Sequence, residues 1–383
     1  MAAIAPERRR KLAALARLTR KLVEPQPIPI DDALLDCFDW VVSDPELDAL
    51  LSMGIEPRRV ADLGLAPDLL ASLVRKDLVV LRPAEAAADG ETVHAAAFLP
   101  GWFESQLCDG GETEHHREFA RRVERLFESW REQNNLFARF FVNALYRLRN
   151  RPFQTIAAGP GAFRRVEVGR AIQAPPAQVR PTASVVELVE RHGATGSIGL
   201  IHCFCRQTRK LVGAPCRFDL PRETCLQVGE TARLAIAHGL ARPISKDEAL
   251  ALLAAAQKGG AIHTVFHDRD DAQREEIAIC SCCWDCCGVL GTWNRGAGAA
   301  YFRCFERATL AAPEKCTACG TCRNFCPTDA LSVVQARISV DERRCLGCGQ
   351  CAFQCPAGAL SLVSQEREVF LGMQPKAKAR LGS

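Results

Sequence analysis

Two cysteine runs near the C-terminal end constrain this chain more than any other feature. Both runs have the spacing C-x2-C-x2-C-x3-C-P, and the second repeats the first at an offset of 29 residues. Their members are Cys316, Cys319, Cys322 and Cys326, then Cys345, Cys348, Cys351 and Cys355. Thiols this close cannot all pair as disulfides, which need Cα atoms about 4.4–6.8 Å apart with suitable side-chain directions. The spacing therefore predicts thiolates that bind metal.

The remaining cysteines and the composition indicate a reducing compartment. The chain has 383 residues, enough for two or three domains, and 18 of its 20 cysteines follow residue 200. No stretch reaches the roughly 18 apolar residues of a membrane span, and the basic residues 8–11 precede no apolar signal region. We therefore expect a cytoplasmic protein without a membrane span. A net charge of +4 is too small to indicate nucleic acid as a partner.

Residues 313–363 resemble the bacterial ferredoxins that hold two [4Fe–4S] clusters. The resemblance implies one-electron transfer, and it implies that the fourth cysteine of each run ligates the other cluster. One cluster would then take Cys316, Cys319, Cys322 and Cys355, and the other Cys345, Cys348, Cys351 and Cys326. Gly320, Gly347 and Gly349 allow the tight loops that such sites need. Zinc also suits C-x2-C pairs, but two complete copies with a trailing proline favour iron–sulfur clusters.

Nine further cysteines lie between residues 203 and 287 and predict one or two additional Fe–S clusters. The predicted ligands are Cys205, Cys216, Cys225, Cys280, Cys283, Cys286 and Cys287. We expect Cys205, Cys216 and Cys225 to join one later cysteine, and the other later cysteines to form a second centre. Buried structural thiols, a redox-active dithiol and a zinc site remain alternatives.

The chain also resembles a group of uncharacterised bacterial and archaeal iron–sulfur proteins. The resemblance covers residues 150–365, where a C-x-C-R segment, two spaced cysteines and a dense cysteine run precede a two-cluster ferredoxin. Residues 99–104 (LPGWFE) resemble the N-terminal part of that group. The dense run of the group often has a cysteine where Asp285 stands, so the resemblance implies that this ligand is missing here.

The pattern of helices and strands predicts an α+β fold in three parts. We expect a basic helix and linker at 1–30, a helical domain at 31–165, a cysteine-rich α/β-like domain at 166–305, a ferredoxin-like domain at 306–365 and a basic tail at 366–383. Within 31–82 the order helix, turn, helix, strand indicates a winged-helix-like unit. Residues 112–149 predict a long helical region, and Ser245 with Glu248 predicts a helix N-terminus.

A few other side chains are candidates for secondary roles. Arg206 is predicted either to donate hydrogen bonds to a cluster sulfur or to pair with a surface carboxylate. His202 lies next to the first middle cysteine, but a core or solvent position is favoured over ligation. His263 and His267 fall in a predicted strand, where residues four apart lie about 13 Å from each other, so they do not form a metal pair. The isolated Cys37 and Cys108 are interpreted as structural.

Three functions remain open from the sequence. The first is an electron-transfer protein that exchanges single electrons with redox partner proteins, with the N-terminal residues as a docking scaffold. The second is a reductase whose middle centre is catalytic, although the chain has no G-x-G-x-x-G or P-loop phosphate motif. The third is a redox-sensing regulator that reads DNA through the winged-helix-like unit. Only Arg75 and Lys76 are basic in the expected recognition segment, which disfavours DNA binding.

Overall fold

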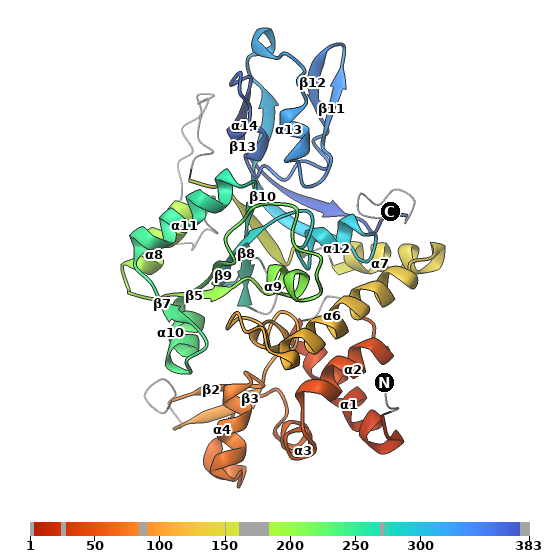
Figure 1. The fold of residues 1–383 in the computed structure, drawn as a ribbon, viewed down its shortest axis with the longest axis vertical. Helices are drawn as coiled ribbons and strands as arrows, with labels where there is room; N and C mark the ends of the chain where they lie inside the picture. Colours follow the sequence, from red (N-terminus) through yellow and green to blue (C-terminus); the bar gives the residue numbers. More distant parts are fainter. Residues whose placement is uncertain are drawn as a thin grey trace.

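The structure is a computed structural model that describes residues 4–23, 28–83, 90–149, 151–160, 184–268, 272 and 274–375. It is a mixture of helices and strands, which agrees with the predicted α+β class. The predicted strand at 166–168, the boundary between 165 and 166 and the basic residues 376–383 lie outside the described residues. Figure 1 shows the N-terminal helices, a central sheet and the C-terminal module following one another along the long axis of the molecule.

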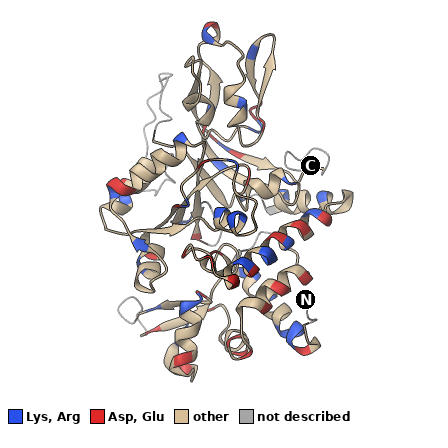
Figure 2. Cartoon of the chain, viewed as in Figure 1, with Lys and Arg blue, Asp and Glu red and all other residues tan. Residues whose placement is uncertain are grey.

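The N-terminal part consists of helices and a small sheet. Its elements are α1 (Pro6–Arg20), α2 (Asp32–Val41), α3 (Asp44–Met53), β1 (Arg58–Arg59), α4 (Pro67–Arg75), β2 (Val79–Arg82), β3 (Thr92–Ala95), α5 (Trp102–Ser105) and α6 (Glu114–Glu132). The three strands pair antiparallel in the order β1-β3-β2. Lys, Arg, Asp and Glu alternate along α6 in Figure 2, and its Arg122 forms an ion pair with the buried Asp36 of α2.

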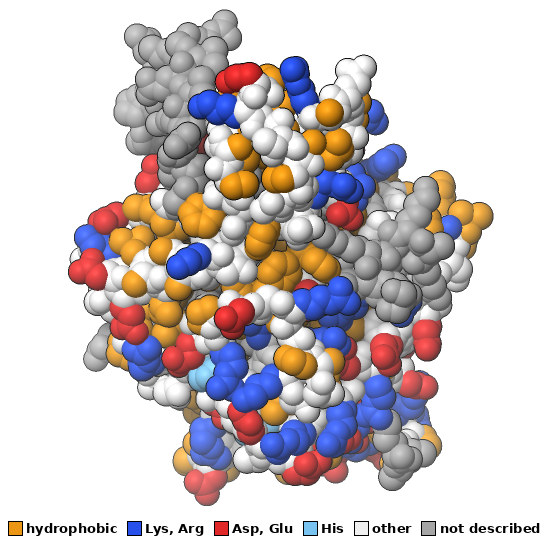
Figure 3. Space-filling view, turned by 45° about the horizontal axis from the view of Figure 1, so that its top comes forward, with side chains coloured by type: hydrophobic (Ala, Val, Ile, Leu, Met, Phe, Trp, Pro, Cys, Tyr) orange, Lys and Arg blue, Asp and Glu red, His pale blue; other side chains and the backbone are white. Residues whose placement is uncertain are grey.

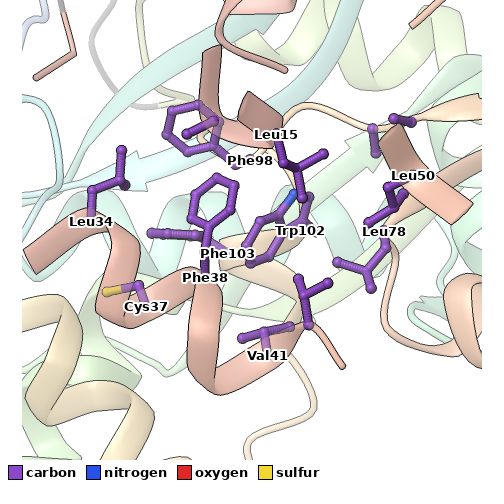
Figure 4. Packing of buried hydrophobic residues seen from close by; sticks show 14 of the residues in the cluster. Leu15, Leu34, Cys37, Phe38, Val41, Leu50, Leu78, Phe98, Trp102 and Phe103 are labelled. Carbon is purple, nitrogen blue, oxygen red and sulfur yellow. The ribbon is translucent and has the colours of Figure 1, made fainter. Parts of the chain in front are cut away.

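An aromatic cluster forms the centre of the N-terminal core, as Figure 4 shows. Phe38 of α2 is completely buried, and its ring lies 5.3 Å from Phe98, 4.8 Å from Trp102 and 5.8 Å from Phe103. Edge-to-face contacts of this kind add to the free energy gained from burial of the rings. Two of these aromatic residues belong to the LPGWFE segment, so that segment packs in the core of the N-terminal part.

The predicted helical region at 112–149 is interrupted once. The helix α6 ends at Glu132, and α7 (Leu136–Arg149) begins after a short connection. The first helix buries the side chains that share its apolar stripe, among them Phe119 and Leu126. The second helix instead leaves large apolar side chains exposed, namely Leu136, Phe137, Phe140, Phe141 and Leu148.

A sheet of eight strands forms the middle of the molecule. Its order is β13-β10-β4-β8-β9-β6-β5-β7. The strands are β4 (Gln154–Ala157), β5 (Ile198–His202), β6 (Glu223–Val228), β7 (Arg242–Pro243), β8 (Ile262–His267), β9 (Glu276–Cys282), β10 (Ala300–Leu310) and β13 (Leu360–Leu371). Among the strands that the structure describes, only β10 and β4 pair in parallel. The expectation of an α/β-like middle domain is therefore wrong, because such domains are built on parallel strands.

Helices cover the two faces of this sheet unequally. They are α8 (Val185–Gly193), α9 (Phe204–Leu211), α10 (Gly229–Ala237), α11 (Lys246–Lys258) and α12 (Leu290–Asn294). One sheet face packs against α8 and α11 through Leu200, Leu226, Val265 and Ile279. Ser245 caps α11 by accepting a hydrogen bond from the N–H of Glu248, as the sequence predicts. The other face carries most of the middle cysteines.

The C-terminal module lies at the end of the long antiparallel pair β10 and β13 (Figure 1). It contains α13 (Thr321–Asn324), β11 (Leu331–Val334), β12 (Arg337–Val340) and α14 (Gln350–Phe353). The boundaries expected at 305–306 and 365–366 fall inside β10 and β13, so these two strands join the module to the sheet. In Figure 3 apolar side chains gather on the face just below this module. Among the described residues, no helix has the length and apolar character needed to cross a membrane.

The buried position of Phe38 leads to a prediction for Phe38→Ala. Removing the ring leaves a cavity between Phe98, Trp102 and Phe103, so the free energy of unfolding of the N-terminal part should fall by about 3–5 kcal/mol. Urea unfolding followed by tryptophan fluorescence measures this change. Leu148→Ala is the control, because its side chain is 83% exposed and its loss should change that free energy by less than about 0.5 kcal/mol. Equal effects of the two substitutions would contradict this description of the core.

Candidate metal centres

Two small cavities in the C-terminal module bring the predicted cluster ligands together. Each has a volume of about 20 Å³. The first is lined by Cys316, Cys319, Cys322 and Cys355, and the second by Cys326, Cys345, Cys348 and Cys351. These are the two sets of four that the sequence predicts, each with one cysteine from the opposite run. The donors fit iron–sulfur clusters, because four thiols converge on each cavity.

The glycines in these loops have conformations that other residues adopt with strain. Gly320 and Gly349 have φ angles of 80° and 81° and precede α13 and α14. A Cβ atom on Gly347 would lie 1.8 Å from the carbonyl oxygen of Glu306, so only glycine fits this close approach. Glycine therefore lets the two loops wrap around their cavities.

Backbone N–H groups point at the fourth cysteine of each run. The N–H of Ala330 donates to Cys326 Sγ at 3.2 Å, and that of Ala359 donates to Cys355 Sγ at 3.3 Å. The two contacts are 29 residues apart, so the repeat in the sequence is also a repeat in hydrogen bonding. Hydrogen bonds to sulfur stabilise thiolates and the metal centres that they hold.

The middle cysteines form two groups, of which the first is the triad Cys216, Cys283 and Cys286. Their sulfur atoms lie within 4.8 Å of one another, with 3.4 Å from Cys216 to Cys283 and 3.1 Å from Cys283 to Cys286. Hydrogen bonds from Cys216 and Cys286 hold the pKa of the Cys283 thiol well below its usual range. The same hydrogen bonds raise the pKa values of Cys216 and Cys286, so the close approach of the three sulfur atoms, and not the pKa of one thiol, indicates a metal site.

The second group, Cys205, Cys225, Cys280, Cys282 and Cys287, is assembled by strand pairing. Cys225 of β6 lies directly opposite Cys280 of β9, and their sulfur atoms are 3.1 Å apart. Cys282 shares the face of Cys280, because side chains two apart on a strand point the same way. Hydrogen bonds from Cys280 and Cys287 keep the pKa of Cys282 well below its usual range. Cys205 accepts a hydrogen bond from the N–H of Gly288, next to Cys287.

This grouping differs from the predicted one. The structure does not bring Cys205, Cys216 and Cys225 together, because Cys216 joins the triad while the other two belong to the second group. The dense run at 280–287 contributes to both groups. In each adjacent pair, Cys282–Cys283 and Cys286–Cys287, one thiol belongs to the triad and the other to the second group. The prediction omitted Cys282 and also Cys203, whose thiol interacts with Cys205. Alternation along β9 was the signal that would have placed Cys282 with Cys280.

Arg206 is the cation beside the middle cysteines. It is only 4% exposed and donates to the carbonyl oxygens of Pro221 and Ser281 and to Thr224. The predicted surface pairing with a carboxylate is therefore wrong. Burial acts to lower the pKa of Arg206, but nearby thiols, Cys203 first among them, raise it above its ordinary value. A buried positive charge here stabilises thiolates around it.

The other candidate side chains belong to neither group, although the thiol of Cys108 lies close enough to Cys225 to interact with it electrostatically. His202 stands near Glu223, with 3.8 Å between ring Nδ1 and a carboxylate oxygen. His263 and His267 lie on β8, which confirms the predicted strand. Cys37 and Cys108 are buried in the N-terminal core.

The C-terminal module and the triad are in direct contact. Trp284 lies between two triad cysteines in the chain, and its indole N–H donates to the carbonyl oxygen of Asn324 at 3.3 Å. Asn324 itself lies between Cys322 and Cys326. Phe218 packs against both Trp284, at 5.5 Å, and Phe325, at 6.3 Å. These contacts connect the two sets of cysteines through one short path of packed residues.

A larger space, the middle cavity, borders both groups of middle cysteines. Its volume is about 230 Å³, and eight of the nine middle cysteines line it. Glu104 of the LPGWFE segment also lines it. Burial raises the pKa of Glu104 to about 8, against the effect of a 2.7 Å hydrogen bond from the N–H of Gly101. This carboxyl group is therefore protonated at neutral pH.

Comparison with known proteins identifies one part of the chain. Residues 309–359 match the family model of the 4Fe-4S dicluster domain. The chain thus carries an iron–sulfur module of the kind used in electron transfer. No curated protein and no solved structure matches the chain. The resemblance of residues 150–365 to a wider group stays a prediction.

The triad predicts the outcome of Cys283→Ala. This substitution should remove any metal bound at the triad, because the Cys283 thiol is hydrogen-bonded to both other members, and it should leave metal bound in the C-terminal module in place. Metal content per chain and electron paramagnetic resonance of the reduced protein measure the two effects. Cys37→Ala is the matched control and should retain all metal, because Cys37 lies in the N-terminal core. A Cys283→Ala chain with unchanged metal content would show that the triad is not a ligand set.

Glu104 predicts a specific pH dependence of stability. Its pKa is about 8 in the folded chain and about 4.5 without burial, so between these pH values the folded state binds more protons than the unfolded state. Stability should therefore fall as pH rises through this window, by up to about 1.4 kcal/mol per pH unit. Glu104→Gln should reduce that slope, as measured by unfolding midpoints from about pH 5 to about pH 8. Identical slopes for both chains would contradict a buried, protonated Glu104.

Proposed function

We propose that this chain is an iron–sulfur electron-transfer protein that exchanges single electrons with redox partner proteins. The match of residues 309–359 to the 4Fe-4S dicluster domain supports the chemistry. The proposal places the protein in a reducing compartment such as the cytoplasm, and all 20 cysteines are free thiols, which agrees with that environment.

Two [4Fe–4S] clusters are assigned to the C-terminal module. Their ligands are Cys316, Cys319, Cys322 and Cys355 for one, and Cys345, Cys348, Cys351 and Cys326 for the other. The two four-cysteine cavities support this assignment. When bound, such clusters supply one-electron redox chemistry. The glycine loops and the backbone N–H groups hold the thiolates in place and stabilise their negative charge.

One or two further Fe–S centres are assigned to the middle cysteines. The triad supplies three thiolates, and Cys203 is one candidate for a fourth, because it interacts electrostatically with Cys286 and Arg206 as well as hydrogen-bonding to Cys205. The second group supplies five thiolates around Cys280 and Cys282. Arg206 balances part of the negative charge that these thiolates bring into a buried site.

The observation that carries the proposal is the contact of Trp284 with Asn324. It joins the loop of the triad to the segment between two C-terminal cluster ligands. Separate metal sites with unrelated structural roles would not need this contact. A protein that conducts electrons does need its centres to lie close together, and the path through Trp284, Phe218 and Phe325 provides that proximity.

A second candidate function is a reductase in which the middle centre meets a substrate. The middle cavity favours it, because an electron carrier without a substrate does not require a space of this size beside its thiols. In this reading the C-terminal module accepts electrons from a partner protein and the middle domain uses them. The protonated carboxyl group of Glu104 lies on the wall of the cavity, where it is a local source of protons.

We interpret the N-terminal part as winged-helix-like. Its order of α3, β1, α4, β2 and β3, with the sheet order β1-β3-β2, supports this interpretation. DNA reading by α4 is not favoured, because Lys76 donates to the carboxylate of the buried Glu46 and leaves only Arg75 as a basic side chain there. The N-terminal part is therefore proposed as a docking scaffold.

The proposal predicts the metal content of anaerobically purified protein. Two clusters account for about eight irons per chain, and one or two middle centres raise the total to about 12 or 16. Iron, acid-labile sulfide and zinc per chain measure this directly. Eight irons with no zinc would restrict the clusters to the C-terminal module. Eight irons with one zinc would make the triad a zinc site and remove it from electron transfer.

A further inference from the structure

The middle cavity is larger than metal centres require. Each C-terminal cavity, lined by a complete set of cluster ligands, has a volume of about 20 Å³, whereas the middle cavity has about 230 Å³. Two further centres of similar size would thus leave part of it free. The remaining space needs another explanation, because protein interiors are close-packed and hold few voids larger than a water molecule.

Gln154 places an unpaired amide on the wall of this cavity. Its side chain is completely buried, and neither its nitrogen nor its oxygen has a hydrogen-bond partner among the described residues. Leaving a buried amide unpaired costs free energy that a folded protein normally avoids. The cost is recovered when a ligand supplies the missing donor and acceptor.

The sheet directs Gln154 toward the same side as the middle cysteines. Gln154 of β4 lies opposite Phe266 of β8, which lies opposite Ala278 of β9, two residues before Cys280. Directly paired residues of antiparallel strands share a face, so Gln154 and Cys280 both face the cavity. From strand spacing and rise, their Cα atoms are about 12 Å apart. A ligand that binds Gln154 therefore lies beside the second cysteine group.

The other walls define the kind of ligand. Two further N–H groups on lining side chains lack partners among the described residues, namely Nε1 of Trp130 and Nε of Arg206. The cavity thus offers more donors than acceptors, which suits a carbonyl oxygen. Most of the remaining wall is apolar and comes from Leu99, Phe127, Val142, Phe153, Phe266 and Met373. Apolar walls with a few placed polar groups are typical of small-molecule sites.

We propose that the middle cavity binds a small organic molecule with an apolar body and a carbonyl or carboxamide group that pairs with the amide of Gln154. The inference rests on the proposed function, because the ligand gains its significance from the redox centre beside it. If the chain is a reductase, molecules of this class are its substrates. Gln154 is the residue that selects the oxygen-bearing group.

Two probes that differ in the polar group test the proposal on the full chain, reconstituted anaerobically with its metal. Cinnamamide has a ring and a carboxamide, and trans-β-methylstyrene has the same ring and double bond without the amide. Isothermal titration should show that the unsubstituted chain binds cinnamamide at least about tenfold more tightly than trans-β-methylstyrene. In Gln154→Met this preference should disappear, because methionine retains the length and loses the hydrogen bonds.

The unfolding temperature gives an independent test, because Gln154→Met should weaken cinnamamide binding without lowering the stability of the ligand-free chain. Without ligand, Gln154→Met should unfold at the same temperature or a higher one, because the substitution removes an unpaired buried amide. Gln207→Met is the matched control at another completely buried glutamine that does not line the cavity. The amide nitrogen of Gln207 donates to the carbonyl oxygen of Gly111 at 2.8 Å, while its amide oxygen has no partner among the described residues. Because Gln207→Met removes a hydrogen bond that the folded chain makes, it should lower the unfolding temperature and leave the preference for cinnamamide unchanged.

Several outcomes would overturn the inference. They are no binding of cinnamamide by the unsubstituted chain, equal affinity for the two probes, a preference that survives Gln154→Met, or a lower unfolding temperature of that variant. The metal content of the same samples tests the proposed function separately. Full iron content without cinnamamide binding rejects only the ligand site. Iron confined to the C-terminal module rejects the middle redox centre itself.

Discussion

The register of three strands, β6, β9 and β8, is the constraint on which the middle of this molecule depends. It sets Cys225 opposite Cys280 and turns Cys282 to the same side. Cys283, next along the chain, must then point elsewhere, and it meets Cys216 instead. A shift of one residue in this pairing would send every cysteine on β9 to the opposite face, into the apolar layer against α8 and α11. The register of the strands therefore determines which thiols meet.

The attachment of the C-terminal module follows from the same sheet. The long strands β10 and β13 extend from the sheet edge into the module, and Arg367 of β13 donates to the carbonyl oxygens of Glu306 and Cys345. Asn294 of α12 donates to the carbonyl oxygen of Pro327, which follows a cluster ligand. These contacts, together with the one from Trp284, fix the module against the triad. The proposed electron exchange between the centres would depend on this fixed geometry.

Sequence predicted the parts of the structure that depend on local spacing. The spacing within each cysteine run and the cap at Ser245 depend on residues close in the sequence, whereas the exchange of the fourth cysteine between the runs was implied by the resemblance to ferredoxins. The grouping of the middle cysteines was not predictable in this way, because Cys216 and Cys283 are 67 positions apart in the sequence and meet only through the order of the strands. Gln154 gave no signal at all, since its importance arises from a cavity formed by distant segments. The domain boundaries differ for the same reason, because β10 and β13 serve both sheet and module.

The most direct test of the central claim, that the middle cysteines form a redox centre joined to the C-terminal clusters, is the number of electrons that the protein accepts. Anaerobic coulometric titration with a low-potential reductant measures it. Each [4Fe–4S] cluster takes about one electron, so the account predicts three or four electrons per chain, all reversibly returned. Two electrons per chain, with the middle thiols reacting as free thiols, would contradict it.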